Sequence, residues 1–186
     1  MPEETDPTKM ALDDPELMRI WGLINAGWDN IESLLYAAFD SMIDDSEHVT
    51  RAIFYSQKNH AARRDMVESL AKYFFRDNET GYGPLKNAIN RVKARSQARN
   101  ELAHGDWAAL LVGGAPAVEV VRTTQKPSIE ETLNSSYDKA ALKRVADDMA
   151  DTAKVLKEAV EPLKQQKLAR RPPTKAGWVK VPRLLP

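Results

Sequence analysis

The chain has 186 residues, of which 42% are hydrophobic and 29% are charged, and its formal net charge at pH 7 is zero. A chain of this size and composition is expected to form one globular domain with tails, and a neutral total gives no bulk attraction for a polyanion. Its lack of cysteine excludes a disulfide framework, thiolate chemistry and a zinc–sulfur site. No run approaches the roughly 18 consecutive apolar residues of a membrane span, and the acidic N-terminus is unlike a secretory signal. We therefore expect a soluble, cytoplasmic protein.

Charge is unevenly distributed between the two ends of the chain. Residues 1–20 hold six acids against two bases, whereas residues 164–186 hold seven bases and no acid. Such ends are usually solvated tails, although an acidic head with a basic tail is also used as a partner-binding device. We divide the chain into an acidic tail over 1–14, a helical domain over 15–165 and a basic, proline-rich tail over 166–186.

The first predicted helix runs from Pro15 to Met42. Apolar residues recur there at steps of three and four, which is the spacing of an amphipathic helix. Asp13 or Asp14 is placed to cap its N-terminus, and a proline suits its first turn.

Two further helices are predicted before the middle of the chain. One runs from about Lys58 to Phe75, after the less regular "TRAIFYSQ", with Ser56 as its candidate cap. The residues "RDNETGYGP" that follow are typical of a loop because they are rich in Asn, Gly and Pro. The next helix is predicted from Pro84 to Ala103.

After the third helix the apolar period changes from that of a helix to two. The stretches "WAALLVGG" and "AVEVVRT" predict a β-hairpin over about 107–123, and a polar stretch follows. A fourth helix is predicted from near Tyr137, behind Ser135 or Ser136, with a nearly heptad apolar stripe as far as Leu163. The sequence therefore predicts an all-α fold, a four-helix up-and-down bundle with a short β-hairpin between helices three and four.

The stretch "ARNELAHGDW" places an arginine on the apolar stripe of the third helix. Arg99 follows Ile89 and Val92 at steps of ten and seven, so it shares their face. A guanidinium stays charged in proteins, and burying it unpaired costs several kcal/mol. Arg99 must therefore pair with a carboxylate, cap carbonyl groups, reach solvent at the end of the bundle or line a polar cleft.

Asn100 and His104 give the end of the same helix a set of groups suited to phosphate chemistry. Arginine binds phosphate oxygens in bidentate fashion, and histidine moves protons near neutral pH. His104 lies roughly 140° around an ideal helix from Arg99, but a frayed last turn would bring the imidazole beside the guanidinium. In the alternative interpretation, Arg99 pairs with an acid on a neighbouring helix and His104 simply ends its own helix.

Two stretches of the chain are locally basic. Residues 84–100 hold five bases and no acid, which makes a ridge suited to a polyanion. The segment "HAARR" places His60, Arg63 and Arg64 near the start of the second helix, where a helix N-terminus and two arginines form a candidate phosphate site. The alternative is an exposed basic turn. Arg95, His60 and Arg64 are our candidate contacts to RNA or phosphate.

The pattern Arg-Asn-x-x-x-His at the end of the third helix of a four-helix bundle resembles the HEPN superfamily (higher eukaryotes and prokaryotes nucleotide-binding domains). In that superfamily an arginine is followed four to six residues later by a histidine, commonly with a polar residue after the arginine. Arg99, Asn100 and His104 fill these positions. The continuation "HGDW" is similar to bacterial and phage members in which a short β-hairpin separates the last two helices.

The resemblance implies a metal-independent endoribonuclease that works as a homodimer, with the two arginine–histidine pairs facing a shared cleft. It implies that a ribose 2′-hydroxyl attacks the adjacent phosphate and leaves a 2′,3′-cyclic phosphate. His104 would act as general base or acid, Arg99 would stabilise charge on the phosphoryl oxygens, and Asn100 would orient His104 or the RNA. HEPN proteins often bring a polar or acidic residue from another helix, for which Asp29 is our candidate, although a solvated helix face explains Asp29 equally well.

Relatives in this superfamily include toxins and antiphage effectors, which would add an antitoxin or another protein as a partner. Others have lost catalysis and only bind, so a catalytically silent module that binds RNA or protein is the main alternative. A structural bundle whose Arg99 is neutralised internally is a third. We expect no metal and no cofactor, since Asp147, Asp148 and Asp151 are typical of an exposed face and no nucleotide-binding loop or zinc-binding helix motif is present.

Overall fold

The computed structural model describes residues 14–104, 106–112, 115–123 and 132–170, with side chains over 14–103 and 137–170. The predicted tails lie largely outside these ranges. Within them the chain forms five helices and three strands, in the order α2 (Pro15–Met42), α3 (Glu47–Ser56), α4 (His60–Phe74), α5 (Glu79–His104), β1 (Asp106–Val112), β2 (Ala115–Thr123), β3 (Thr132–Asp138) and α6 (Lys139–Arg170). The protein is mostly helical, as its sequence predicts. None of the described helices is long and apolar enough to cross a membrane.

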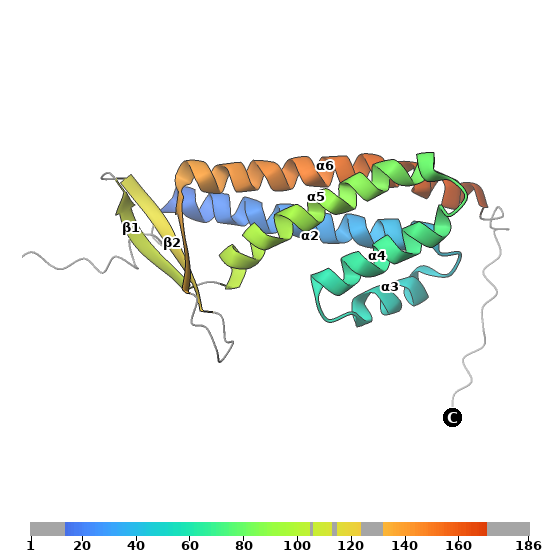
Figure 1. Cartoon of the computed structure of the whole chain (residues 1–186), viewed down its shortest axis with the longest axis horizontal. Helices are drawn as coiled ribbons and strands as arrows, with labels where there is room; N and C mark the ends of the chain where they lie inside the picture. The colour runs from blue at the N-terminus through green and yellow to red at the C-terminus, as the bar shows by residue number, and fades with distance from the viewer. Residues whose placement is uncertain (1–13, 105, 113–114, 124–131, 171–186) are drawn as a thin grey trace, which may run out of the picture.

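Helices α2 and α6 lie side by side and run in the same direction (Figure 1). Lys139 at the start of α6 contacts Asp14 at the start of α2, and Lys167 near the end of α6 contacts Asp40 near the end of α2. In a simple up-and-down bundle of four helices, the first and last would be antiparallel. The parallel arrangement follows from the short helix α3, which adds one reversal of the chain between α2 and α4.

Helix α3 was not predicted, because only two of its residues, Thr50 and Phe54, are buried. Two positions one turn apart are too few to show a helical period. Its packing is tertiary: the Phe54 ring lies 5.5 Å from Tyr36 and 5.6 Å from Phe39, both on α2. A short helix depends on such packing for its stability.

Helices α4 and α5 begin at other residues than the sequence predicts, and their capping residues show why. Ser56 is the last residue of α3 and not the cap of α4; that cap is Asn59, whose Oδ1 accepts from the Ala62 amide at 2.8 Å. The predicted loop before Pro84 is largely helical, because Asn78 starts α5 early by accepting from the amide of Gly81 at 3.0 Å. Pro84 is therefore the sixth residue of the helix, where its missing amide hydrogen leaves the Thr80 carbonyl without its intrahelical bond.

The three strands form one antiparallel sheet in the order β1-β2-β3, at the end of the molecule where α2 and α6 begin (Figure 1). Strands β1 and β2 occupy the two apolar segments of the predicted hairpin, whereas β3 falls in a polar stretch and was not predicted. Tyr137 belongs to β3 and does not begin the last helix. Helix α6 begins at Lys139, where Asp138 Oδ1 accepts from the amide of Ala141 at 2.6 Å.

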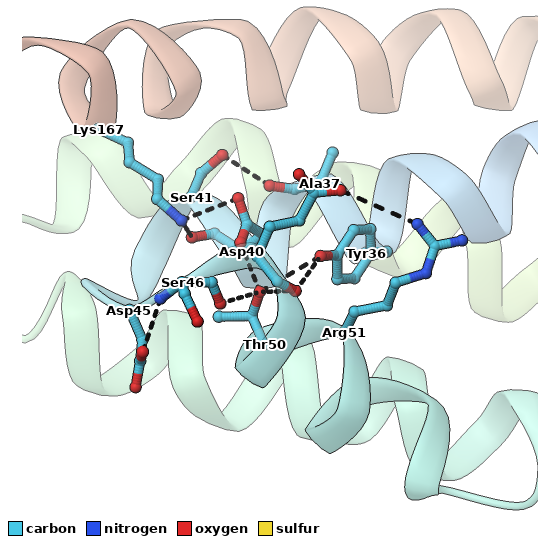
Figure 2. A network of polar contacts seen from close by, with 10 residues as sticks. Tyr36, Ala37, Asp40, Ser41, Asp45, Ser46, Thr50, Arg51 and Lys167 are labelled. Carbon is cyan, nitrogen blue, oxygen red and sulfur yellow. Dashed lines mark hydrogen bonds and ion pairs between the residues drawn. The ribbon is translucent and has the colours of Figure 1, made fainter. Parts of the chain in front are cut away.

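Helix α6 continues to Arg170, past the predicted domain end at 165, because its last turns are tied to the rest of the protein. Figure 2 shows Lys167 reaching Asp40, with Nζ 2.8 Å from Oδ2 and donating to the Asp40 carbonyl at 2.6 Å. Thr50 of α3 donates to the other carboxylate oxygen at 2.6 Å. Lys167 is only 7% exposed, so this pairing is what allows its charge to be buried.

The core lies mainly between α2, α4, α5 and α6. The largest fully buried side chains are contributed by all the helices: Phe54, Ile20, Ile24, Ile31, Leu35, Leu85, Ile89, Leu102, Leu142, Met149, Leu156 and Val67. Helices α2 and α6 approach closely at Gly27, where an added Cβ would lie 3.0 Å from the Cβ of Met149. Helix α4 packs against α2, and α5 packs against α6 and α4.

Candidate functional site

A cleft of about 540 Å³ lies where the middle of α2, the start of α4 and the last turns of α5 meet. The residues that give it its chemistry are Trp28 and Glu32 from α2, His60 and Arg63 from α4, and Arg99 and Asn100 from α5. Three helices thus bring together Arg99 and Asn100, which are predicted catalytic residues, and His60, which is a predicted phosphate contact.

Trp28 supports two of the polar groups in the cleft. This tryptophan is 3% exposed and belongs to the hydrophobic core. The His60 ring lies 4.2 Å from the Trp28 ring between centroids, and the Arg99 guanidinium carbon lies 5.5 Å from the Trp28 ring. Cation–π attraction stabilises a guanidinium at that separation, which is one physical reason why Arg99 can occupy the apolar stripe of α5.

Glu32 holds the two basic residues of α4. One carboxylate oxygen contacts His60 Nδ1, and the other accepts from Arg63 Nη1 at 3.2 Å. Burial raises the pKa of the Glu32 carboxyl, but the hydrogen bonds and electrostatic interactions with His60 and Arg63 outweigh burial and leave the pKa below its ordinary value. Glu32 is therefore ionised at neutral pH. Arg63 is fixed further by donating from Nε to the Gln57 carbonyl at 3.1 Å.

Among the described residues, only one of the two ring nitrogens of His60 has a partner. Nδ1 contacts Glu32, whereas Nε2 is buried and has no hydrogen-bond partner among the described residues. A carboxylate at Nδ1 favours the tautomer with its proton on that nitrogen. Nε2 of neutral His60 is then an acceptor with no donor, which is a costly state for a buried polar atom.

Arg99 and Asn100 contact each other at the α5 side of the cleft. Arg99 Nη1 donates to Asn100 Oδ1 at 3.3 Å, so the amide orients the guanidinium. Lys58 also lines the cleft. Three basic side chains, Lys58, Arg63 and Arg99, therefore border a space that is lined by one carboxylate among the described residues, and the excess of positive charge favours an anion.

His104 ends α5, but its side chain lies outside the part of the chain whose side chains are described. The predicted pairing of Arg99 with His104 therefore stays a prediction. Helix α5 does end within one residue of the predicted Ala103, so the backbone of His104 lies one turn beyond Asn100.

Three other predicted site residues lie away from this cleft. Arg64 is buried and bonds Asp65 at 3.0 and 2.7 Å, so its neighbour Arg63 is the α4 arginine that lines the cleft. Arg95 pairs with Asp148 on α6 at 3.2 Å. Asp29 is exposed on α2, and Glu32, one turn further along, is the acid in the cleft.

Comparisons of the chain with protein-family models, with characterised proteins and with solved structures find no match. The resemblance to the HEPN superfamily therefore rests on the residues of this chain. Across the described residues, no group of three or more histidines and acids is placed to hold a metal ion.

Proposed function

We propose that this protein is a metal-independent endoribonuclease of the HEPN type and that the cleft around Arg99 binds the phosphate at which RNA is cut. The observation that carries the proposal is the convergence of Arg99 and Asn100 with Lys58, His60 and Arg63 in one cleft, in a chain with no net charge. A cationic cleft bordered by guanidinium groups suits a phosphodiester.

In this proposal, Arg99 stabilises negative charge on the non-bridging phosphate oxygens as the 2′-oxygen attacks phosphorus. Asn100 holds the guanidinium in position through its 3.3 Å hydrogen bond. His104 takes part in proton transfer from the end of α5. The resemblance adds a homodimer, in which the clefts of two copies face each other.

The test is cleavage of a panel of single-stranded and structured RNAs in the presence of excess chelator. We expect the native protein to cut RNA and to leave 2′,3′-cyclic phosphate ends. Arg99→Ala is expected to lower the rate by about 100-fold or more, whereas Arg144→Ala, on the exposed surface of α6, leaves it unchanged. Equal rates for native protein and Arg99→Ala contradict the proposal, as does a native protein that cuts no RNA in the panel.

A catalytically silent module that binds RNA or protein is the second candidate. It is favoured by one observation: Glu32 already neutralises His60 and Arg63 inside the cleft. Binding of the RNA panel that depends on Arg99, without any cleavage, would identify this alternative.

A further inference from the structure

Resting on the proposed ribonuclease function, we infer that His60, oriented by Glu32, is the general base that accepts the proton of the attacking 2′-hydroxyl. The reaction needs two proton transfers, one from the nucleophile and one to the leaving oxygen. Within one protomer, the sequence pattern supplies only His104 for these transfers. The cleft contains a second imidazole from the same chain.

The first support is the orientation of the ring. The side chains of His60 and Glu32 are only 13% and 16% exposed, and the carboxylate contacts Nδ1 directly. Glu32 is fixed in turn by Arg63 at 3.2 Å. A partly buried carboxylate at one ring nitrogen selects the tautomer that leaves the other nitrogen as the proton acceptor, and it lies beside the imidazolium that forms on proton transfer.

The second support is the state of Nε2. This atom is buried, and among the described residues it has no hydrogen-bond partner. A hydroxyl donating to it would satisfy the only open position of the ring. Because Nε2 is buried in the protein without RNA, the proposed step requires the side chains around it to rearrange when RNA binds.

The third support is the position relative to the phosphate-binding group. The rings of His60 and Trp28 are in contact, and the Arg99 guanidinium lies over the same tryptophan. An imidazole and a guanidinium placed on one ring can address the 2′-oxygen and the phosphate of a single nucleotide. Arg64 and Asp29, which the sequence also offered as site residues, do not line this cleft.

The step conserves atoms and charge. The 2′-oxygen forms a bond to phosphorus while its proton passes to Nε2 of His60, and the bond from phosphorus to the 5′-oxygen breaks. The departing 5′-oxygen takes a proton from a general acid, for which the resemblance offers His104. The products are a 2′,3′-cyclic phosphate and a free 5′-hydroxyl, and the two histidines exchange the proton through solvent before the next turnover.

The test is single-turnover RNA cleavage from about pH 5 to pH 9 by native protein, His60→Gln and Glu32→Gln, with His48→Gln and Glu158→Gln as matched controls on exposed surfaces. We expect His60→Gln to lower the rate by about 100-fold or more and to remove the rise of rate with pH on the acid side. Glu32→Gln is expected to lower the rate by about tenfold or more, with Glu32→Asp restoring part of it. Binding of a 2′-deoxy RNA should stay within about threefold for all variants, and this binding also shows that they are folded.

A substrate with sulfur in place of the 5′-bridging oxygen separates the two histidines, because thiolate leaves without protonation. We expect this substrate to restore cleavage by His104→Ala and not by His60→Gln. Restoration of His60→Gln, or native activity and an unchanged pH profile in His60→Gln, overturns the inference while the ribonuclease function stands. A native protein that cuts no RNA overturns both.

Discussion

At the scale of single residues, the cleft is built from charges that are held in place by other side chains. Glu32 is shared between His60 and Arg63, and Arg99 lies against Trp28 and Asn100. Such side chains lose little conformational freedom when a ligand binds, because their conformations are already restricted in the folded protein.

The pKa of Glu32 gives the first prediction. Because this pKa is lower in the folded protein than in the unfolded chain, ionised Glu32 stabilises the fold above the ordinary carboxyl pKa of about 4.3. That contribution is lost as the pH falls through the lower, folded value. We expect Glu32→Gln to reduce the free energy of unfolding at pH 7 and to differ less from native protein as the pH falls below about 4. Urea titrations at several pH values measure this, and a constant difference down to pH 2 would contradict it.

The buried pair of Lys167 and Asp40 gives the second prediction. Removing the carboxylate leaves an ammonium that is 7% exposed without its counter-charge, so we expect Asp40→Ala to cost about 3 kcal/mol of unfolding free energy. Lys167→Met keeps the apolar stem and removes the charge, so it should cost less than half of that. Urea denaturation compares the two variants, and equal losses would mean that leaving the buried ammonium unpaired costs no more than losing the ion pair itself.

At the scale of elements, the packing of two helices decides which substitutions each helix tolerates. Gly22 and Gly27 both lie on α2, but a Cβ at Gly22 meets nothing within 4 Å, whereas one at Gly27 meets Met149 of α6 at 3.0 Å. We expect Gly22→Ala to raise the free energy of unfolding by about 0.5–1 kcal/mol through helix propensity. Gly27→Ala should lack this gain and lower stability by forcing α2 and α6 apart. Thermal or urea unfolding measures the stability of the two variants. A stabilised Gly27→Ala would show that the contact between Gly27 and Met149 has room for a methyl group.

The cap of α4 links an element to the cleft. Asn59 accepts from the amide of Ala62, next to His60 and Arg63. We expect Asn59→Ala to lower the free energy of unfolding by about 1 kcal/mol and to slow RNA cleavage, because the first turn of α4 carries the two residues held by Glu32. Asn59→Asp retains a capping oxygen and should retain stability. Loss of stability in both variants would point to a role other than capping.

The sequence predicts those elements that carry their own signals and misses those that depend on tertiary contacts. Helix α2 has a regular apolar period and a capping aspartate, so both its ends are predicted correctly. Helix α3 depends on Phe54 and the last turn of α6 on Lys167, and neither residue shows in a local pattern. In the cleft, Arg99 is conspicuous as a charge on an apolar face. Glu32 lies one turn from the predicted Asp29, and Arg63 is the neighbour of the predicted Arg64. Which of them lines the cleft depends on how α4 packs on α2, and this packing cannot be read from the sequence.

At the scale of the whole molecule, a chain with no net charge places Lys58, Arg63 and Arg99 around one cleft. The sheet lies at one end of the helical body, and α5 runs from the far end towards it, ending next to β1 (Figure 1). The cleft at the start of α4 and the end of α5 therefore belongs to the helical body, and strand β1 begins just beyond it. RNA that enters the cleft would meet residues of three helices in one protomer.

The salt dependence of RNA binding follows from this arrangement. Removing one cationic side chain that binds a phosphate should reduce the slope of log affinity against log salt by a little less than one. We expect Arg99→Ala and Arg63→Ala each to lower the slope by about that amount, measured with 2′-deoxy RNA by fluorescence anisotropy. Arg144→Ala serves as the control, and an unchanged slope for Arg99→Ala would place the phosphate elsewhere.

The most direct measurement is the structure of the protein bound to an RNA whose reactive nucleotide lacks the 2′-hydroxyl. We expect a phosphate within hydrogen-bond distance of the Arg99 guanidinium, with the 2′-carbon of the preceding ribose facing Nε2 of His60. An RNA bound on another face, with the cleft around Arg99 unchanged, would contradict the central claim that this cleft is the site of RNA cleavage.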